Sequence, residues 1–247
     1  RKSMTRVIAS RLKSLGNPPK TMVIDKQKII NLSKRIDQSG VLKAKLPKGN
    51  WTIMRFGMTS TGATNTPASD SGRGLEVDKF SKKALKVHYD AFVSKVVKAS
   101  KPVAPNAMKY VEIDSYEMGG QNWTDQYDKM FKKRFGYDLI KFLPLYAGRF
   151  VESPKSIDAV SYDIRKLNSH LMVENYYGYF TDLCHKDGIK TYIEPYGFGP
   201  MDDLATGGKA DIPMGEFWTG RPKIMVSSAV QSARAYGKNI ISAEAFT

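Results

Sequence analysis

Residues 191–197 read TYIEPYG, and this short stretch decides the fold class of the chain. It begins just after Gly188, which ends a long helix-like stretch, and a glycine-rich loop over residues 197–208 follows it. A short β-like run between a helix and a loop is typical of one βα unit of a parallel sheet. Its fourth residue, Glu194, stands at the end of the β-like run.

Three further segments also place a glutamate at or just after a β-like run. They read VEIDSYE at residues 111–117, MGEFW at 214–218 and IISAEAF at 240–246. In a barrel of parallel strands, catalytic groups lie at the C-terminal strand ends, because the βα loops there form the active-site face. We therefore expect one acidic rim that contains four glutamates: Glu117, Glu194, Glu216 and Glu244.

The pattern predicts an α/β fold, a partial (β/α)8 TIM-type barrel with a small β-rich segment at the N-terminus. Residues 59–247 are expected to form this partial barrel catalytic domain, with only about four of the eight strands present. Residues 1–58 are expected to be the end of a β-sandwich-like insertion. A turn there precedes a predicted strand over residues 51–56, in which Trp51 and Ile53 alternate with other residues.

Helices are expected over residues 81–98, 124–135, 159–185 and 223–236. Ser81 and Thr124 are the expected N-caps of the first two helices. The lone cysteine, Cys184, lies among apolar helical residues, so we interpret it as a packed core residue, and one cysteine excludes an intrachain disulfide.

Composition narrows the function classes. Hydrophobic residues make up 41% of the 247, and no apolar run approaches the length of a membrane helix. The net charge of +15 comes from lysines scattered along helix-like stretches, without an arginine-rich tract or a nucleic-acid motif. We therefore expect neither nucleic acid nor membrane as a partner.

The ends of the sequence favour an internal piece of a longer protein. The chain starts at Arg1 and its last strand-like run stops at Thr247. The lack of a signal peptide therefore says nothing about the compartment. We expect the full-length parent to be secreted or periplasmic, which this piece does not determine.

Clustered carboxylates and aromatic rings indicate chemistry on a sugar. Glycoside hydrolysis uses one protonated carboxyl group to release the leaving oxygen and one ionised carboxylate to activate water or attack the sugar. The four rim glutamates are the candidates for these roles. The candidate substrate-binding residues are Asp114, Trp123, Tyr196 and Trp218, since apolar sugar faces stack on aromatic rings.

The acidic residues could supply the oxygen ligands of a metal site. Six acidic residues would suit calcium, namely Asp70, Glu76, Asp78, Asp114, Asp202 and Asp203. They show no EF-hand spacing, and the three histidines show no zinc motif. Most of these acids are expected to cap helices or accept loop hydrogen bonds, and no metal ligand is assigned.

An ordered series of motifs runs through most of residues 45–247: WTIMRFG at 51–57, PA at 67–68, GLEVDK at 74–79, DSYE at 114–117, QNWT at 121–124, FGYD at 135–138, ENYY at 174–177 and AEAFT at 243–247. This series resembles the α-L-rhamnosidases of glycoside hydrolase family one hundred and six. The resemblance implies a large, multidomain, mostly bacterial enzyme that acts on plant pectin or rhamnosides.

The resemblance also implies a mechanism and a site. It implies an inverting (β/α)8 barrel enzyme in which a calcium ion helps hold the sugar. On the matching motifs, Glu117, Glu216 and Glu244 are similar to the acidic residues of that site. Glu117 and Glu244 are expected in or beside the reacting pair, with Glu216 as second carboxylate or metal ligand; acid and base stay unassigned.

Two alternatives remain open at this point. The first is a retaining glycosidase of galactosidase type that uses Glu194 and Glu244. The second is a non-catalytic carbohydrate-binding relative, because a fold alone does not establish activity. The separation of the carboxyl groups distinguishes retention from inversion, being about 5–5.5 Å for the former and about 6.5–9.5 Å for the latter.

Overall fold

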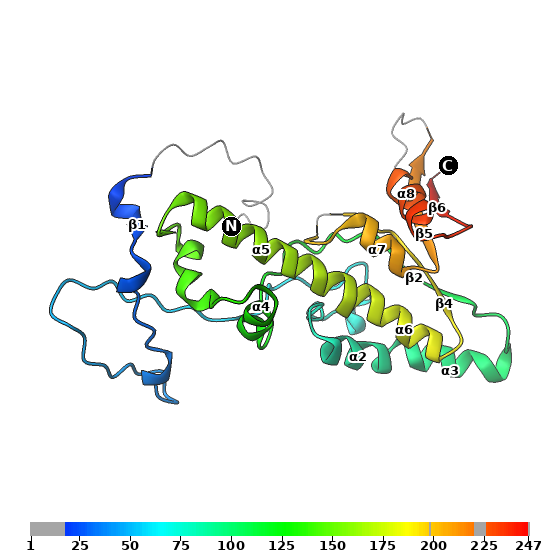
Figure 1. Ribbon diagram of the computed structural model, residues 1–247. Helices are drawn as coiled ribbons and strands as arrows, with labels where there is room; N and C mark the ends of the chain where they lie inside the picture. Colours follow the sequence, from blue (N-terminus) through cyan, green and yellow to red (C-terminus); the bar gives the residue numbers. More distant parts are fainter. Residues whose placement is uncertain (1–17, 198, 220–225, 247) are drawn as a thin grey trace. The chain divides into compact units, whose positions relative to one another are not determined.

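The computed structural model describes residues 18–197, 199–219 and 226–246 (Figure 1). These residues divide into two compact units. The first unit holds residues 60–125 and those from 165 onward, and the second holds residues up to 59 together with 126–164. The division into an insertion over residues 1–58 and a barrel over 59–247 stays a prediction, and residues 1–17 lie outside the described part.

The first unit is built on a sheet of four parallel strands. Strands β2 (Tyr110–Ile113), β4 (Lys190–Ile193), β5 (Ile212–Trp218) and β6 (Ser242–Phe246) lie in that order. Every neighbouring pair is parallel, and helices lie between consecutive strands along the chain, as in a (β/α) barrel. The predicted βα pattern is confirmed at the level of a mixed α/β fold with a partial-barrel sheet.

The strand register decides which residues meet at the C-terminal edge. Ile113, the last residue of β2, pairs with Ile193, the last residue of β4. Further along the sheet, Glu216 of β5 pairs with Glu244 of β6. Because the strands are parallel, the residues that follow β2 and β4 emerge at the same edge as these two glutamates.

Helices on one side of the sheet form the main core of this unit. Helices α2 (Lys82–Ala91), α3 (Val93–Val103) and α6 (Tyr179–Lys186) contribute the buried cluster Leu85, Tyr89, Val93, Val97, Phe180, Leu183 and Cys184, which Ile189 completes. Burial raises the pKa of the Cys184 thiol to about 12, which leaves it protonated and unreactive at neutral pH. The interpretation of Cys184 as a core residue is confirmed.

The helix expected over residues 159–185 is one long helical run with a widened middle. It comprises α5 (Pro154–Leu171), the π-helical segment η6 (Met172–Gly178) and α6. Gly188 has a φ of +76°, a left-handed conformation that favours glycine and accompanies the end of the run. Hydrophobic spacing predicted the run but not the π-helical turns within it.

Local caps explain where the other helices begin. The Ser81 hydroxyl accepts a hydrogen bond from the Ala84 N–H at 3.2 Å, as predicted for an N-cap, and the helix breaks at Phe92 between α2 and α3. Thr124 is not a cap: helix α4 (Tyr127–Phe135) begins after Gln126. The predicted helix over 223–236 is α8 (Ser227–Ala235), with residues 223–225 outside the described part.

The predicted strand over residues 51–56 is wrong. These residues form no strand, and most of them, including Trp51 and Ile53, are exposed. The Trp51 indole instead donates to the Pro47 carbonyl at 2.8 Å within the preceding turn. A β-strand needs a neighbour to accept its backbone hydrogen bonds, and residues 51–56 have none. The strands that the structure describes in this unit are the short parallel pair β1 (Val23–Ile24) and β3 (Phe150–Val151), beside an isolated bridge between Ile36 and Leu42.

Short 3-10 helices complete the second unit. They are η1 (Lys20–Met22), η2 (Lys26–Lys28), η3 (Ser33–Arg35) and the longer η5 (Leu139–Ala147), whose N-cap Asp138 accepts from the Ile140 N–H at 2.9 Å. The remaining helices belong to the first unit: η4 (Asp70–Gly72) and α7 (Asp203–Lys209). Within the described residues we find no helix whose length and apolar content would let it span a bilayer.

Candidate active site

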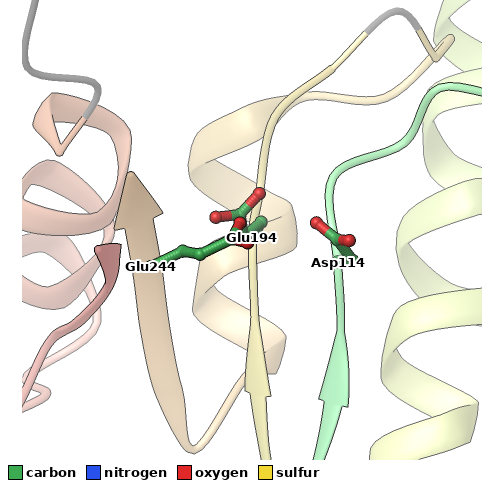
Figure 2. Close-up of side chains that lie close together, drawn as sticks. All are labelled: Asp114, Glu194 and Glu244. Carbon is green, nitrogen blue, oxygen red and sulfur yellow. The ribbon is translucent and has the colours of Figure 1, made fainter. Parts of the chain in front are cut away.

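Three carboxylates converge at the C-terminal edge of the sheet. Asp114 directly follows β2, Glu194 directly follows β4, and Glu244 lies on β6. One carboxylate oxygen from each of the three lies within 4.8 Å of the others. Figure 2 shows the three side chains pointing toward one another from separate strands. This edge is where a barrel of parallel strands places its active site.

Glu194 is the buried member of this cluster. Its side chain is 1% exposed, and its Oε1 atom has no hydrogen-bond partner among the described residues. The pKa of Glu194 is raised to about 8: burial raises it most, a hydrogen bond with Tyr196 lowers it, and the negative charges of Asp114, Glu244 and Glu216 raise it. The Glu244 pKa is also raised, first by burial and then by Asp114.

Glu216 is oriented by two aromatic donors. The Tyr196 hydroxyl donates to its Oε2 atom at 3.1 Å, and the Trp218 indole N–H donates to its Oε1 atom. Tyr196 is itself buried, and burial together with its bonds to Glu194 and Glu216 holds its pKa far above the usual range. Tyr196 therefore stays neutral, and its one hydroxyl hydrogen is available for the bond to Glu216.

Glu117 lies outside the converging set. It is exposed and stands a few residues beyond the end of β2, so it is not among the described acids whose oxygens meet within 4.8 Å. The residue before it, Tyr116, is fixed to the neighbouring strand end, because its N–H donates to the Tyr196 carbonyl at 3.1 Å. Glu117 thus belongs to the same edge but to a different part of it.

Trp123 and two of the acidic residues considered for calcium lie outside the carboxylate cluster. The Trp123 side chain is half-buried, and its carbonyl accepts a hydrogen bond from Gln121 at 3.2 Å. Two of the acids considered for calcium accept backbone N–H groups instead. Asp78 accepts from the Phe80 N–H at 3.0 Å, and Asp202 caps α7 by accepting from Ala205 at 2.7 Å.

Sequence reasoning missed the role of Asp114 in the cluster, because it placed this residue only among sugar-binding candidates and general oxygen ligands. A signal was available in the strand ends. Asp114 follows VEI as Glu194 follows TYI, and parallel pairing with the two isoleucines aligned makes these acids neighbours. Sequence reasoning also gave no role to Lys79, a buried lysine discussed below.

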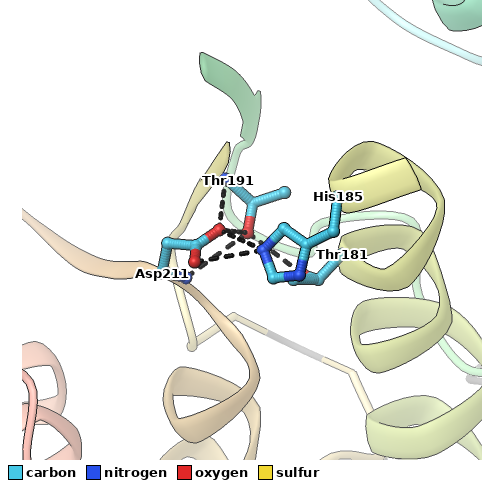
Figure 3. A network of polar contacts seen from close by, with 4 residues as sticks. All are labelled: Thr181, His185, Thr191 and Asp211. Carbon is cyan, nitrogen blue, oxygen red and sulfur yellow. Dashed lines mark hydrogen bonds and ion pairs between the residues drawn. The ribbon is translucent and has the colours of Figure 1, made fainter. Parts of the chain in front are cut away.

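A second polar network lies at the opposite, N-terminal part of the sheet (Figure 3). Asp211 Oδ2 lies 2.8 Å from His185 Nε2 and accepts the Thr191 N–H at 2.8 Å. The Thr191 and Thr181 hydroxyls lie 3.0 Å apart. Burial works to raise the Asp211 pKa, but hydrogen bonds from Thr191 and His185 outweigh it and lower the pKa. In a barrel this edge serves stability rather than catalysis.

Comparison with known proteins identifies the family. The model of the glycoside hydrolase family one hundred and six, described as alpha-L-rhamnosidase, matches residues 5–247. The chain belongs to this family. The resemblance seen in the motifs is confirmed.

Two relatives match most of this chain. The rhamnosidase from Novosphingobium sp. PP1Y matches in structure with a TM-score of 0.74 and 27% identity, over 90% of this chain and 23% of that chain. A protein of Formosa agariphila, provisionally named as a beta-glucuronidase, is 41% identical over 231 residues, 93% of this chain and 20% of its own length. The chain spans about a fifth of these relatives.

The converging acids of this family member fit a hard cation. Carboxylate oxygens are the ligands that calcium prefers, and three of them lie within 4.8 Å of one another. The buried Glu194 Oε1 has no described partner, so a cation would satisfy an oxygen that is otherwise costly to bury. Neither Asp114, Glu194 nor Glu244 is paired with a lysine or arginine that the structure describes.

Proposed function

We propose that the protein carrying this chain is an inverting glycoside hydrolase that removes terminal α-L-rhamnosyl residues from plant polysaccharide or rhamnosides. The observation that carries this proposal is the convergence of three carboxylates at the C-terminal edge of the sheet, in a member of the α-L-rhamnosidase family. Asp114, Trp123, Tyr196 and Trp218 are proposed to contact the sugar.

Glu117 and Glu244 are the proposed reacting pair. Inversion needs acid and base about 6.5–9.5 Å apart, which leaves room for a water molecule between base and sugar. One oxygen of Glu194 lies within 4.8 Å of one oxygen of Glu244, which is closer than that arrangement uses. Glu117, at the same edge but outside the cluster, supports the pairing with Glu244, and Glu216 is the oriented second carboxylate.

One carboxyl group of this pair gives a proton to the substrate, and the other takes a proton from the attacking water. The acid gives its proton to the glycosidic oxygen as the bond to the anomeric carbon breaks. The base takes a proton from the water that attacks the opposite face of the sugar, so the acid ends ionised and the base ends protonated. The released rhamnose then has the inverted, β configuration.

Asp114 and Glu194 are the proposed ligands of a calcium ion, which would lie next to the reacting Glu244. A bound calcium ion would hold sugar hydroxyls and neutralise the cluster. In its absence, burial most strongly and the neighbouring carboxylates in addition raise the pKa values of Glu194 and Glu244. Tyr196 would still donate its hydroxyl hydrogen to Glu216 and so keep that side chain in place.

Glutamine variants of the reacting pair test the proposal. Glu117→Gln and Glu244→Gln are each expected to lower kcat on an aryl α-L-rhamnoside by at least about 10²-fold, because general acid–base catalysis contributes that much. A set of leaving groups assigns the roles, because the acid variant recovers on substrates whose leaving group needs no proton. Glu152→Gln, a glutamate of the other unit, is the matched control. Normal turnover by both variants would sink the assignment.

A retaining mechanism through Glu194 and Glu244 is the second candidate. The specific observation in its favour is that their oxygens lie within 4.8 Å, close to the separation of about 5–5.5 Å found in retaining enzymes. Proton NMR of the first-formed sugar decides between the two, since inversion releases β-L-rhamnose and retention releases the α anomer. Binding of rhamnose without turnover would instead indicate a non-catalytic relative.

The same assay tests which sugar the enzyme removes. One relative carries the name of a beta-glucuronidase, which would act on an anionic sugar. Aryl β-D-glucuronide is therefore the substrate to compare with aryl α-L-rhamnoside. Faster turnover of the glucuronide would overturn the proposed rhamnose specificity.

A further inference from the structure

Lys79 is a buried cation that the proposed reaction does not use. It is 3% exposed, and its ammonium nitrogen lies 2.5 Å from Glu76 Oε2. The same nitrogen lies over two aromatic rings, 5.5 Å from the centroid of Tyr116 and 5.6 Å from that of Tyr176. A buried charge is costly unless it is paired, and the carboxylate and both rings offset that cost here.

The backbone around Lys79 is tied to other elements. The Lys79 N–H donates to the Gln121 side-chain oxygen at 3.1 Å, which links it to the loop after β2. The Asn175 side chain donates to the Phe80 carbonyl at 2.7 Å, which links it to the π-helical segment η6. Lys79 is therefore held at a defined place, and its charge cannot simply move away from the Tyr116 ring.

Tyr116 is confined from the other side by the loop after β4. Gly197 has a φ of +130°, and a Cβ atom there would lie only 2.3 Å from the Tyr116 carbonyl oxygen. A Cβ atom on Gly199 would lie 2.5 Å from the Tyr116 ring. Two glycines thus let this loop approach Tyr116 closely, while Lys79 lies over its ring. The next residue in the chain is Glu117.

We propose that Lys79 is a positioning residue for Glu117. Its ammonium group, balanced by Glu76, holds the Tyr116 ring, and the backbone of Tyr116 sets where Glu117 stands at the rim. The inference rests on the proposed function, in which Glu117 belongs to the reacting pair. A displacement of about 1 Å of a catalytic group costs about 10²-fold in rate, so this placement affects catalysis strongly.

A double-mutant cycle in the full-length protein tests the link. Lys79→Met keeps the length of the side chain and removes its charge. We expect it to lower kcat on an unactivated rhamnoside by about 10²-fold with little change in KM. Added to Glu117→Gln, it should cause no further loss, because residues that act through one group are not additive. Lys79→Arg should recover part of kcat, since arginine also stacks on aromatic rings.

Controls separate this role from general damage. Lys86→Met removes an exposed lysine that is also ion-paired, to Asp90 at 2.6 Å, and should leave kcat unchanged. If Lys79→Met does not fold, Tyr176→Leu removes one of the two rings and should show the same non-additivity with Glu117→Gln.

The outcomes also distinguish the inference from the proposed function. If Glu117→Gln turns over normally, Glu117 does not belong to the reacting pair, and the positioning role of Lys79 is overturned with it. If Glu117→Gln is impaired and the loss from Lys79→Met persists unchanged in its background, only the positioning role of Lys79 is overturned.

Discussion

Glu194 shows how one buried residue can depend on what binds next to it. Its side chain is almost fully enclosed, and the nearest charged groups that shift its pKa are other carboxylates. Without a cation, the protonated form is favoured near neutral pH, because the pKa is raised to about 8. With a cation in the cluster, the ionised form would be favoured instead.

The stability of the protein should therefore depend on pH through Glu194. Its folded-state pKa is about 8, above the usual value in an unfolded chain, so folding retains a proton there. In chelator, stability from this group is present at acidic pH and is lost as pH rises toward 8. Glu194→Gln, which mimics the protonated form, should lack this loss when melting temperature is measured by scanning fluorimetry.

Calcium should raise the melting temperature of the wild type above that of Glu194→Gln at pH 8. Saturating calcium is expected to raise the melting temperature of the wild type at pH 8 but not that of Glu194→Gln. Glu152→Gln, in the other unit, should follow the wild type in both buffers. Parallel pH profiles for the wild type and Glu194→Gln would contradict the expected role of this carboxyl.

At the scale of single residues, the sequence predicted where the four glutamates lie along the chain, but it did not predict their burial or their hydrogen-bond partners. The four glutamates were found because each ends or follows a β-like run, which is a local pattern. The exposure of Glu117 and the partner-free oxygen of Glu194 depend on how three strands pack, and spacing along one strand does not determine that. The catalytic roles of all four stay predictions.

Among the elements, the network at the N-terminal edge joins helix α6 to two strands. Asp211 precedes β5, Thr191 lies on β4 and His185 lies on α6, so one carboxylate connects three elements. Asp211→Asn should destabilise the fold by about 1–3 kcal/mol, since hydrogen bonds to a charged group are worth this much. The kcat value should not change, because this edge lies away from the carboxylate cluster.

The effect of Asp211→Asn should vanish in acid. The folded-state Asp211 pKa is lowered, so its stabilisation is present above the unfolded value of about 3.9 and is lost as pH falls through the folded value. Urea denaturation at pH 7 and at a pH below the lowered folded pKa measures both limits. Asp90→Asn, at an exposed ion pair on α2, is the control and should cost less than about 1 kcal/mol.

Predictions of single elements succeeded where a residue's own neighbours along the chain decide them. Ser81 caps α2 because its hydroxyl reaches an N–H three residues on, which sequence alone can show. Thr124 has the same local chemistry, yet its hydroxyl donates to Asp78 at 2.5 Å, a partner 46 residues away. The strand predicted over residues 51–56 failed similarly, because strands depend on partners that local alternation does not supply.

At the scale of the whole chain, the proposed cation would lie among three strand ends. Its proposed ligands Asp114 and Glu194 follow β2 and β4, and its charge would also neutralise Glu244 on β6, so its removal should loosen the C-terminal ends of all three together. Hydrogen exchange with and without chelator should show faster exchange at residues 114–117, 194–197 and 242–246. Residues 139–147, in the other unit, are the internal control. Faster exchange confined to one strand would contradict a shared ion.

The parallel pairing of the strands was predictable from the sequence. Repeated β-like runs separated by helices predict parallel pairing, and the order β2-β4-β5-β6 agrees with it. The chain spans about a fifth of the length of the relatives that it matches.

The π-helical turns of η6 determine how far α6 is rotated about the helix axis relative to α5. At about 100° per residue, an unbroken α-helix would place Phe180 about half a turn away from Leu171. Residues 172–178 follow a wider repeat, so the angle between these two buried side chains is no longer that of an α-helix. Deleting one residue there would keep the helix but rotate α6, and would move Phe180 and Leu183 out of the core that they share with α2.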